Sequence, residues 1–209
     1  MSGLFITVEG IEGVGKSTNM AFIAESLESA GHKVCVTREP GGTPMGERIR
    51  QLILETPGDG LSAQGELLLM FAARAEHLNS LIRPALQRGE TVLCDRFTDA
   101  TFAYQGGGRE LGPSLIARLQ DMVQGEMRPD LTILLDVPLE VSAQRVAGRG
   151  EAQDRFEQEQ ELFFGRVRQA YLDIASAEPE RVRVVDASQS LSGVQADIRS
   201  IIDEKVFNK

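Results

Sequence analysis

The sequence has few of the features that membrane proteins and polyanion-binding proteins need. Among its 209 residues there is no apolar window of about 18 residues and no basic N-terminal segment followed by an apolar run, so neither membrane spanning nor export is predicted. The formal net charge of −9 argues against a general binder of nucleic acid or anionic membranes, because such surfaces repel an acidic protein. We therefore expect a cytoplasmic protein whose phosphate sites are local.

Cysteine and histidine are scarce, with two of each. Cys35 and Cys94 each lie in an apolar, strand-like run, so we expect two buried and unpaired thiols, with a disulfide as the alternative. His32 and His77 share no ligand spacing with a cysteine or with each other. A structural transition-metal site is therefore not supported.

Short apolar runs alternate with longer segments of helical spacing. The runs are residues 4–9, 33–39, 91–96, 131–137 and 182–187, and the helical segments include 17–30, 65–88, 113–125, 156–176 and 191–206. Strands that are apolar almost throughout suit a parallel sheet that helices cover on both faces. The alternation predicts an α/β fold with a five-stranded parallel sheet, and the length suits a single domain over residues 1–209.

A complete phosphate-loop pattern opens the chain. Residues 10–17, GIEGVGKS, match Gly-x-x-x-x-Gly-Lys-Ser, and an expected strand and helix flank them as the P-loop NTPase fold requires. The glycines let backbone N–H groups surround a phosphate at the positive end of the helix. Lys16 would reach the β- and γ-phosphates, and the Ser17 hydroxyl would bind Mg²⁺. The residues expected to hold the triphosphate of ATP are Gly10, Gly13, Gly15, Lys16, Ser17 and Thr18. A glycine-rich turn without a ligand is the alternative.

Other classes of phosphate-loop protein fit the chain less well. GTPases read guanine with an Asn-Lys-x-Asp signature, and Asn19, Asn79 and Asn208 stand in no such setting. Motors and partition ATPases would need neither a second anion site nor a closing segment rich in arginine. The sequence predicts both of these features.

Two arginines end neighbouring expected strands. Arg38 precedes a Pro-Gly-Gly turn, and Arg96 follows Asp95, so both face the sheet edge where ligands gather. Because planar guanidinium groups match phosphate oxygens, they predict an anionic substrate, with a surface ion pair of Arg38 as the alternative. Asp95 would hold magnesium through water, or it forms a salt bridge with Arg96 or Arg38.

A site for a planar base is predicted from two further segments. Phe71 and Arg74 lie three residues apart and so share a helix face, which places an aromatic ring beside a hydrogen-bond donor. The alternative for Phe71 is the hydrophobic core. Residues 104–109, YQGGGR, read as a loop in which Tyr104 and Gln105 offer ring and amide contacts, with a connector that binds no ligand as the alternative.

Residues 145–155, RVAGRGEAQDR, have the composition of a lid. Their three arginines and two glycines suit a segment that closes over a reaction and brings positive charge to it. An exposed basic turn is the alternative. However, the variable positions of the phosphate loop contain no cation besides Lys16, so additional charge has to come from elsewhere in the chain.

Together these segments resemble the bacterial thymidylate kinases, which are P-loop nucleoside monophosphate kinases. The similarity runs over almost the whole chain, through FITVEGIEGVGKS, TREPGGTP, LLLMFAARAEH, LCDRFTDATFAYQGGGR, RPDLTILLDV and DRFE. Apart from the phosphate loop no single segment is specific, but their order and spacing are. The resemblance implies phosphorylation of dTMP to dTDP with ATP and Mg²⁺, for dTTP synthesis, in a homodimer. The helices expected at 65–88 and 113–125 are candidates for the dimer interface.

The resemblance also implies roles for the substrate-binding residues. Phe71 would stack on thymine, Arg74 would hydrogen-bond the base edge, and Arg38 and Arg96 would hold the dTMP phosphate. The other residues of the nucleotide pocket would be Glu39, Pro40, Thr101, Tyr104 and Gln105. Tyr104 would occupy the place of a ribose 2′-hydroxyl, which favours deoxyribose.

For catalysis the resemblance implies that Arg149 and Arg155 of the lid act on the transferring phosphoryl group. Glu12 stands where some relatives carry Asp-Arg, which fits the type that supplies its arginine from the lid. Adenine would rest between the region of Arg145 and the loop after Asp186. The residues expected to serve catalysis are Lys16, Arg149, Arg155, Arg96 and Glu12.

Two other interpretations of the sequence remain open. One is a nucleoside monophosphate kinase for dCMP or dGMP on the same scaffold. The other is an ATP-binding regulatory or partition module that ignores monophosphates. An assay of ADP release with a panel of monophosphates separates all three.

Overall fold

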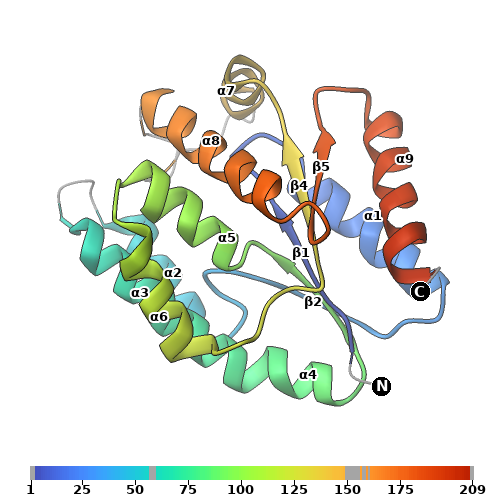
Figure 1. Cartoon of the computed structure of the whole chain (residues 1–209), viewed down its shortest axis with the longest axis horizontal. Helices are drawn as coiled ribbons and strands as arrows, with labels where there is room; N and C mark the ends of the chain where they lie inside the picture. The colour runs from blue at the N-terminus through green and yellow to red at the C-terminus, as the bar shows by residue number, and fades with distance from the viewer. Residues whose placement is uncertain (1–2, 57–59, 149–155, 157–158, 160, 208–209) are drawn as a thin grey trace.

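The computed structural model describes residues 3–56, 60–148, 156, 159 and 161–207. Five parallel strands form a sheet in the order β2-β3-β1-β4-β5, which confirms the predicted architecture (Figure 1). The strands are β1 (Phe5–Glu9), β2 (Val34–Arg38), β3 (Thr91–Asp95), β4 (Leu131–Asp136) and β5 (Val182–Asp186). All five lie within the predicted runs.

Burial of the strands follows their position in the sheet. Every residue of β1 is buried, as are nearly all of β3 and β4, whereas Val36 of β2 and Val184 of β5 are half exposed at the two edges. Edge strands have a neighbour on one side only, so part of their surface remains in water. Cys94 of β3 is buried and free, as predicted, while Cys35 of β2 is free but only partly buried.

Helices connect these strands. The α-helices are α1 (Lys16–Ser29), α2 (Pro44–Glu55), α3 (Ala63–His77), α4 (Arg83–Gln87), α5 (Thr98–Thr101), α6 (Pro113–Gln124), α7 (Leu139–Ala147), α8 (Glu161–Ala177) and α9 (Leu191–Ile202). The π-helical segments η1 (Leu78–Ile82), η2 (Phe102–Gly108) and η3 (Asp203–Phe207) extend α3, α5 and α9. The helix predicted at 156–176 begins only at Glu161, so that boundary was wrong.

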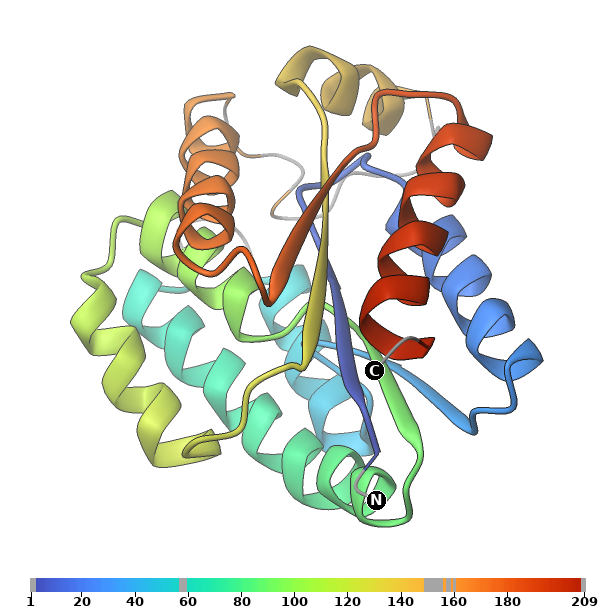
Figure 2. The same ribbon diagram turned by 45° about the vertical axis from the view of Figure 1, so that its right-hand side comes forward.

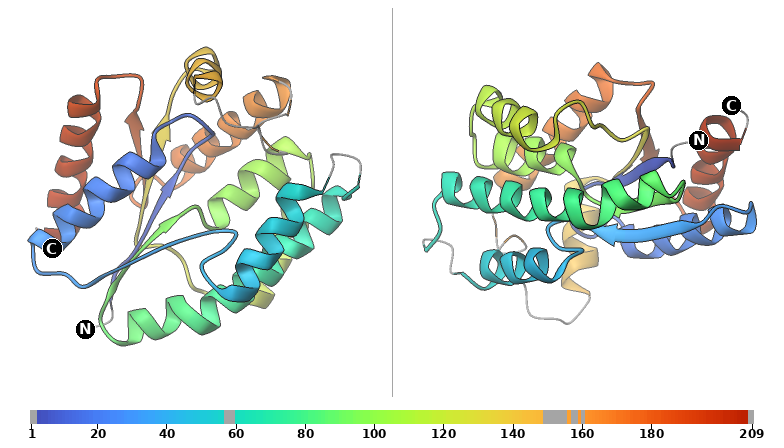
Figure 3. Two further views of the ribbon diagram at one scale, coloured as in Figure 1. Left: turned by 180° about the vertical axis from the view of Figure 1, so that it is seen from behind. Right: turned by 90° about the horizontal axis from the view of Figure 1, so that it is seen from below.

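The helices divide between the two faces of the sheet. Figure 2 shows α1 and α9 together on one side, and α3, α6 and α8 on the other. Seen from behind in Figure 3, α2 lies along the outside of α3. Within the described residues, no helix is both long enough and apolar enough to cross a bilayer.

Helix α2 was not predicted from the sequence, although it has a clear start signal. The Thr43 side chain accepts a hydrogen bond from the Gly46 amide at 3.0 Å, and Pro44 occupies the first turn. A threonine cap followed by proline is typical of a helix N-terminus. Helix α2 therefore begins directly after the Pro-Gly-Gly turn and lies next to the ligand edge of β2.

The glycine run at 106–108 is helical, so its prediction as a loop was wrong. Helix η2 continues through these glycines and packs closely against α8. A Cβ atom on Gly107 would lie 2.9 Å from the Arg166 carbonyl oxygen, and one on Gly108 would lie 2.4 Å from the Phe163 ring. The glycines thus allow two helices to approach closely, and η2 carries Tyr104 and Gln105 on a rigid element.

The sheet register brings the expected functional strand ends to one edge. Asp95 is paired in register with Val8 on one side and with Arg38 on the other, and Asp136 is paired with Asp186. In Figure 1, β4 and β5 point toward α7, and the phosphate loop lies at the same edge. This is the edge at which parallel α/β sheets bind their ligands.

Candidate active site

The phosphate loop joins β1 to α1 in the conformation that its glycines allow. Gly15 has a φ of 88° and caps α1. Gly13 has a φ of 75°, and a Cβ atom there would lie 2.7 Å from the Ser142 carbonyl oxygen of α7. The Lys16 ammonium donates to the carbonyl oxygens of Gly10 at 3.1 Å and Ile11 at 3.0 Å. The lysine therefore lies folded over the loop.

The environment of Lys16 lowers the pKa of its ammonium group. Burial, followed by the nearby Arg96, lowers the pKa of Lys16 from 10.5 to about 8, against the opposing effect of Asp95, Glu12 and Glu9. A bound polyphosphate would favour the charged ammonium, because opposite charges at short range stabilise it. Binding of an anion in the loop is consequently coupled to the protonation of Lys16.

A hollow beside α1 contains both residues that were predicted to bind metal. Ser17 and Asp95 line it together with Arg38 and Glu47. Asp95 Oδ1 is buried and has no hydrogen-bond partner among the described residues, and no ion pair of Asp95 is found there either. A hydroxyl and a carboxylate with a free oxygen suit Mg²⁺, which also takes water and substrate phosphates as ligands. These residues fit the ion.

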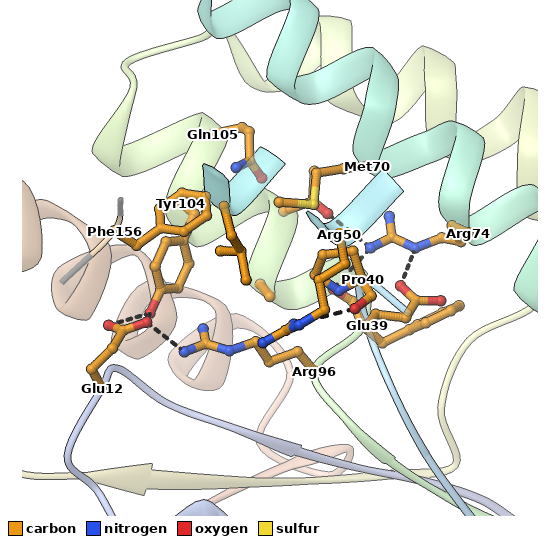
Figure 4. Close-up of a pocket in the computed structure, with 14 residues that line it drawn as sticks. Glu12, Glu39, Pro40, Arg50, Met70, Arg74, Arg96, Tyr104, Gln105 and Phe156 are labelled. Carbon is orange, nitrogen blue, oxygen red and sulfur yellow. Dashed lines mark hydrogen bonds and ion pairs between the residues drawn. The ribbon is translucent and has the colours of Figure 1, made fainter. Parts of the chain in front are cut away.

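A second cavity lies next to the phosphate loop (Figure 4). Of the residues that sequence analysis assigned to a nucleotide site, those that line it are Glu12, Glu39, Pro40, Arg74, Arg96, Thr101, Tyr104 and Gln105. They come from the loop itself, the turn after β2, α3, the end of β3, α5 and η2. Segments far apart in the chain therefore form one pocket at the predicted edge.

Glu12 of the phosphate loop connects the two sites. Its carboxylate accepts from Arg96 Nη2 at 2.8 Å and from the Tyr104 hydroxyl at 2.7 Å. The Arg96 guanidinium carbon lies 4.6 Å from the centre of the Tyr104 ring. Arg96 itself adopts a φ of 68°, a conformation that is uncommon for residues other than glycine. The strand end and the loop thus hold a cation in the cavity wall.

Arg74 is oriented by a buried carboxylate. Its Nε donates to Glu39 at 2.7 Å, and its Nη2 donates to Thr101 Oγ1 at 2.9 Å. Glu39 also accepts from His77 Nδ1 at 2.9 Å, and His77 Nε2 lies 2.7 Å from Thr37 Oγ1. Arg74 Nη1 is buried and has no partner among the described residues. A ligand in the cavity can use this donor.

A second buried carboxylate orients Gln105. The Gln105 amide nitrogen donates to Glu66 Oε1 at 2.8 Å, and Arg109 forms an ion pair with the same carboxylate. Glu66 is fully buried in α3. No role was predicted for Glu66, which stands in no motif, or for Arg109, which ends the YQGGGR segment. Their spacing along the chain does not indicate that they meet.

Phe71 does not line the cavity, although its neighbour Met70 does. The Phe71 ring is 2% exposed and packs with Leu67 and Ile116, while the Arg74 guanidinium lies 4.9 Å from its centre. Met70 lies four residues before Arg74, a spacing that places two side chains on one helix face as well as a spacing of three does. Phe71 therefore lies in the hydrophobic core, which was the alternative interpretation of this residue.

The two strand-end arginines do not share the cavity. Arg38 is exposed and forms an ion pair with Glu47 of α2 at 2.8 Å, whereas Arg96 faces the cavity. Another cation that the sequence analysis missed, Arg50 of α2, lines the cavity and donates to the Pro40 carbonyl oxygen at 3.2 Å. Its helix was not predicted, so its position at the site could not be inferred.

Glu9 lies beneath the site at the end of β1. It is fully buried, and it accepts hydrogen bonds from the Phe97 amide at 2.7 Å and the Tyr171 hydroxyl at 2.8 Å. Burial, followed by the charge of Asp99, raises the pKa of Glu9 to about 7. Glu9 therefore links the phosphate-loop strand to the segment after Arg96 and to helix α8.

Most of the expected lid lies outside the described residues, including Arg149 and Arg155. Arg145, in the last turn of α7, donates to the Ala187 carbonyl oxygen at 3.0 Å and to that of Gly13 at 3.4 Å. It therefore bridges the phosphate loop and the loop after β5. This is the region where the sequence analysis expected adenine.

Comparisons with known proteins agree with this geometry. The thymidylate kinase family model matches residues 8–198. Thymidylate kinases from Pseudomonas syringae pv. tomato and Ectopseudomonas mendocina are each 58% identical to this chain, over 98% and 97% of it and 97% and 96% of their own lengths. A solved thymidylate kinase structure from Ehrlichia chaffeensis aligns with a TM-score of 0.79 and 35% identity, and the alignment covers 97% of this chain and 100% of that one.

Proposed function

Since this chain belongs to the thymidylate kinase family, we propose that its phosphate loop binds ATP and that the adjoining cavity binds dTMP. ATP-dependent phosphorylation of dTMP to dTDP is the reaction of this family. The chain is accordingly a nucleoside monophosphate kinase of nucleotide biosynthesis.

One observation carries the assignment of the two substrates. Glu12 is part of the phosphate loop, and it also lines the cavity through its contacts with Arg96 and Tyr104. A donor in the loop and an acceptor in the cavity would therefore meet at Glu12 and Arg96. Phosphoryl transfer needs such a junction, because positioning the two phosphates supplies much of the rate.

The far end of the cavity suits a pyrimidine base. Arg74 offers an unpartnered donor, and Gln105 offers an amide one helical turn from Thr101. Met70 presents a thioether to the same space, and sulfur makes favourable contacts with aromatic rings. We assign contact with the face of the base to Met70, and we assign Phe71 the supporting position behind Arg74.

Cations near the loop would hold the acceptor phosphate. Arg96 is held by Glu12 of the phosphate loop, and Arg50 lines the same cavity. Arg38 would have to exchange its exposed partner Glu47 for the phosphate, which costs little because such exposed pairs are weak. Tyr104 closes the pocket beside Arg96, where it would contact the sugar.

Ser17 and Asp95 would hold Mg²⁺ next to the triphosphate. The bound ion would neutralise charge on the phosphates. Lys16 would do the same from the protein side once it leaves the carbonyl oxygens of its own loop. No residue has to act as a general base, because the acceptor phosphate oxygen is already an anion.

Arg149 and Arg155 are proposed to act on the transferring phosphoryl group, since the phosphate loop contains no cation besides Lys16. Both lie outside the described residues. We propose that adenine rests against Arg145 and the loop after β5, where Arg145 connects these segments to the phosphate loop.

A homodimer is proposed from the apolar residues that α3 and α6 expose. Leu68 is 57% exposed, Met122 is 74% exposed, and Leu115 is also exposed. The two helices pack side by side, so these residues belong to neighbouring elements. A cytoplasmic location is proposed because ATP and dTMP are available there.

An assay of ADP release tests the function. The protein is supplied with ATP and Mg²⁺, together with dTMP, dCMP, dGMP or no acceptor. We expect rapid ADP release when dTMP is the acceptor and not with dCMP, dGMP or no acceptor. The Lys16→Met variant should not release ADP rapidly with dTMP. A preference for dCMP or dGMP would assign the chain to another monophosphate, and release that does not depend on an acceptor would indicate an ATP-binding module.

A further inference from the structure

Two buried carboxylates define which atoms the base end of the cavity presents. Glu39 occupies Arg74 Nε, and Glu66 occupies the amide nitrogen of Gln105. Glu66 does not line the cavity, and it is fully buried on α3 beside η2. Its effect on substrate binding would therefore act through Gln105.

The chemistry of Glu66 decides how Gln105 is turned. A carboxylate paired with a guanidinium only accepts hydrogen bonds, so the amide nitrogen of Gln105 has to face it. The amide oxygen then points the other way. Gln105 is 1% exposed and lines the cavity, so a ligand there would meet the side of the amide that faces away from Glu66. In Figure 4 the amide projects from η2 toward the space next to Met70.

Arg74 presents the opposite chemistry at the adjacent position. Arg74 donates to Thr101, and Gln105 lies four residues after Thr101 on the continuous α5–η2 helix. The Arg74 guanidinium at Thr101 and the Gln105 amide are therefore about one helical turn apart. A guanidinium can only donate, and its buried Nη1 has no partner among the described residues. The cavity therefore offers a fixed donor beside a fixed acceptor.

We propose that Glu66 is a positioning residue that selects the base through the orientation of Gln105. The inference rests on the proposed binding of a pyrimidine monophosphate in this cavity. A 4-oxo pyrimidine such as thymine has a carbonyl oxygen next to a ring N–H, which complements Arg74 and Gln105 Oε1. Cytosine has an amino group and an unprotonated ring nitrogen at these positions, so donor would face donor and acceptor would face acceptor. Buried mismatches of this kind reject a substrate strongly.

Glu66→Gln tests the proposal because Arg109 remains next to it. Arg109 only donates, so it would take the new amide oxygen and leave the new NH₂ group facing Gln105. Gln105 would then turn its oxygen toward position 66 and its nitrogen into the cavity. We expect the ratio of kcat/KM for dTMP to kcat/KM for dCMP to fall at least about tenfold. Glu66→Asp keeps the carboxylate and should retain most of the preference.

Arg109→Gln is the matched control. It removes the ion pair but leaves the carboxylate of Glu66 to accept from Gln105, so activity and stability change while the dTMP-to-dCMP ratio stays near the wild-type value. A purely structural role of Glu66 would change both variants alike. A folded Glu66→Gln enzyme with an unchanged ratio would overturn the proposal, and so would an equal loss of the ratio in Arg109→Gln.

If thermal melting shows that Glu66→Gln does not fold, kinetics of the wild-type enzyme with N3-methyl-dTMP test the orientation of Gln105 instead. This nucleotide keeps the carbonyl group that Arg74 would bind but has no hydrogen for Gln105 Oε1. We expect its kcat/KM to fall well below that of dTMP, and equal values would refute the orientation of Gln105. A wild-type enzyme that is inactive on dTMP would instead refute the proposed function, so the two failures are distinguishable.

Discussion

Arg74 and Glu39 form an ion pair of 2.7 Å in which both side chains are almost fully buried. The pair lies at the end of the cavity that we propose to bind the base, and His77 donates to the other carboxylate oxygen. A Cβ atom on Gly42 would lie 2.4 Å from His77 Nε2, so the glycine of the turn after β2 makes room for the ring. The position of Arg74 thus depends in part on His77 and Gly42, which do not line the cavity.

His77→Leu should raise the KM for dTMP. Glu39 would lose a buried donor, and Arg74 would no longer be held in one orientation, which costs about 1–3 kcal/mol or roughly tenfold in KM. His77→Asn can still donate from the position of Nδ1 and should restore most of the affinity. Steady-state kinetics with dTMP and ATP separate the effects. Equal KM values for wild type and His77→Leu would rule out this role.

Met70→Ala and Phe71→Ala should have different effects. Met70 lines the cavity and is partly buried, so its loss should raise the KM for dTMP with a small change in stability. Phe71 fills a hydrophobic cluster, so its loss should lower the free energy of unfolding by about 3–5 kcal/mol. Urea denaturation and dTMP titration of both variants provide the comparison. A larger loss of dTMP affinity in Phe71→Ala would return the base contact to the phenylalanine.

ATP binding should weaken as the pH rises from 7 to 9. Lys16 has a pKa of about 8 without ligand, because burial disfavours its charge, and the triphosphate raises this pKa. Above pH 8 the protein must take up a proton to bind, so affinity should fall by roughly tenfold per pH unit until the pKa of the complex is reached. Calorimetry in two buffers of different ionisation enthalpy measures the number of protons that the protein takes up when ATP binds. Lys16→Met should bind ATP without proton uptake, and uptake in that variant would contradict the assignment.

The stability of Glu9→Gln relative to wild type should increase as the pH rises from 5 to 7.5. The pKa of Glu9 is raised by burial from 4.5 to about 7 in the folded protein, so folding favours the protonated acid. Stability from this group is present at low pH and is lost as the pH rises through about 7, by on the order of 3 kcal/mol. Urea denaturation at several pH values measures it. Glu28→Gln, at an exposed position of α1, is the control, and parallel curves for wild type and Glu9→Gln would exclude the effect.

Arg149→Ala should lower kcat by about 100-fold or more and leave dTMP binding nearly intact, as removal of a transition-state cation does elsewhere. Arg155→Ala, measured beside it, shows which arginine acts on the transferring group. Rapid-quench or steady-state kinetics at saturating ATP and dTMP provide the values. An unchanged kcat in Arg149→Ala would transfer the role to Arg155 or Arg145.

Local patterns were sufficient to predict the phosphate loop and the five strands. The loop needs Gly13 and Gly15 at backbone angles that other residues avoid, and its lysine follows at a fixed spacing, so eight consecutive residues specify it. The inner strands are buried on both faces and read as continuous apolar runs. Such signals depend on neighbours in the chain, and they predicted the sheet edge where the site lies.

The identity of the groups that face the ligand depended on tertiary packing. Met70 rather than Phe71 lines the cavity because one step along a helix rotates a side chain by about 100°, and the packing of α3 on α6 decides which side is covered. Arg50 reaches the cavity only because α2 lies along α3, and Gln105 is turned by Glu66, a carboxylate 39 residues away in sequence. Contacts between distant segments set these orientations, and no local spacing encodes them.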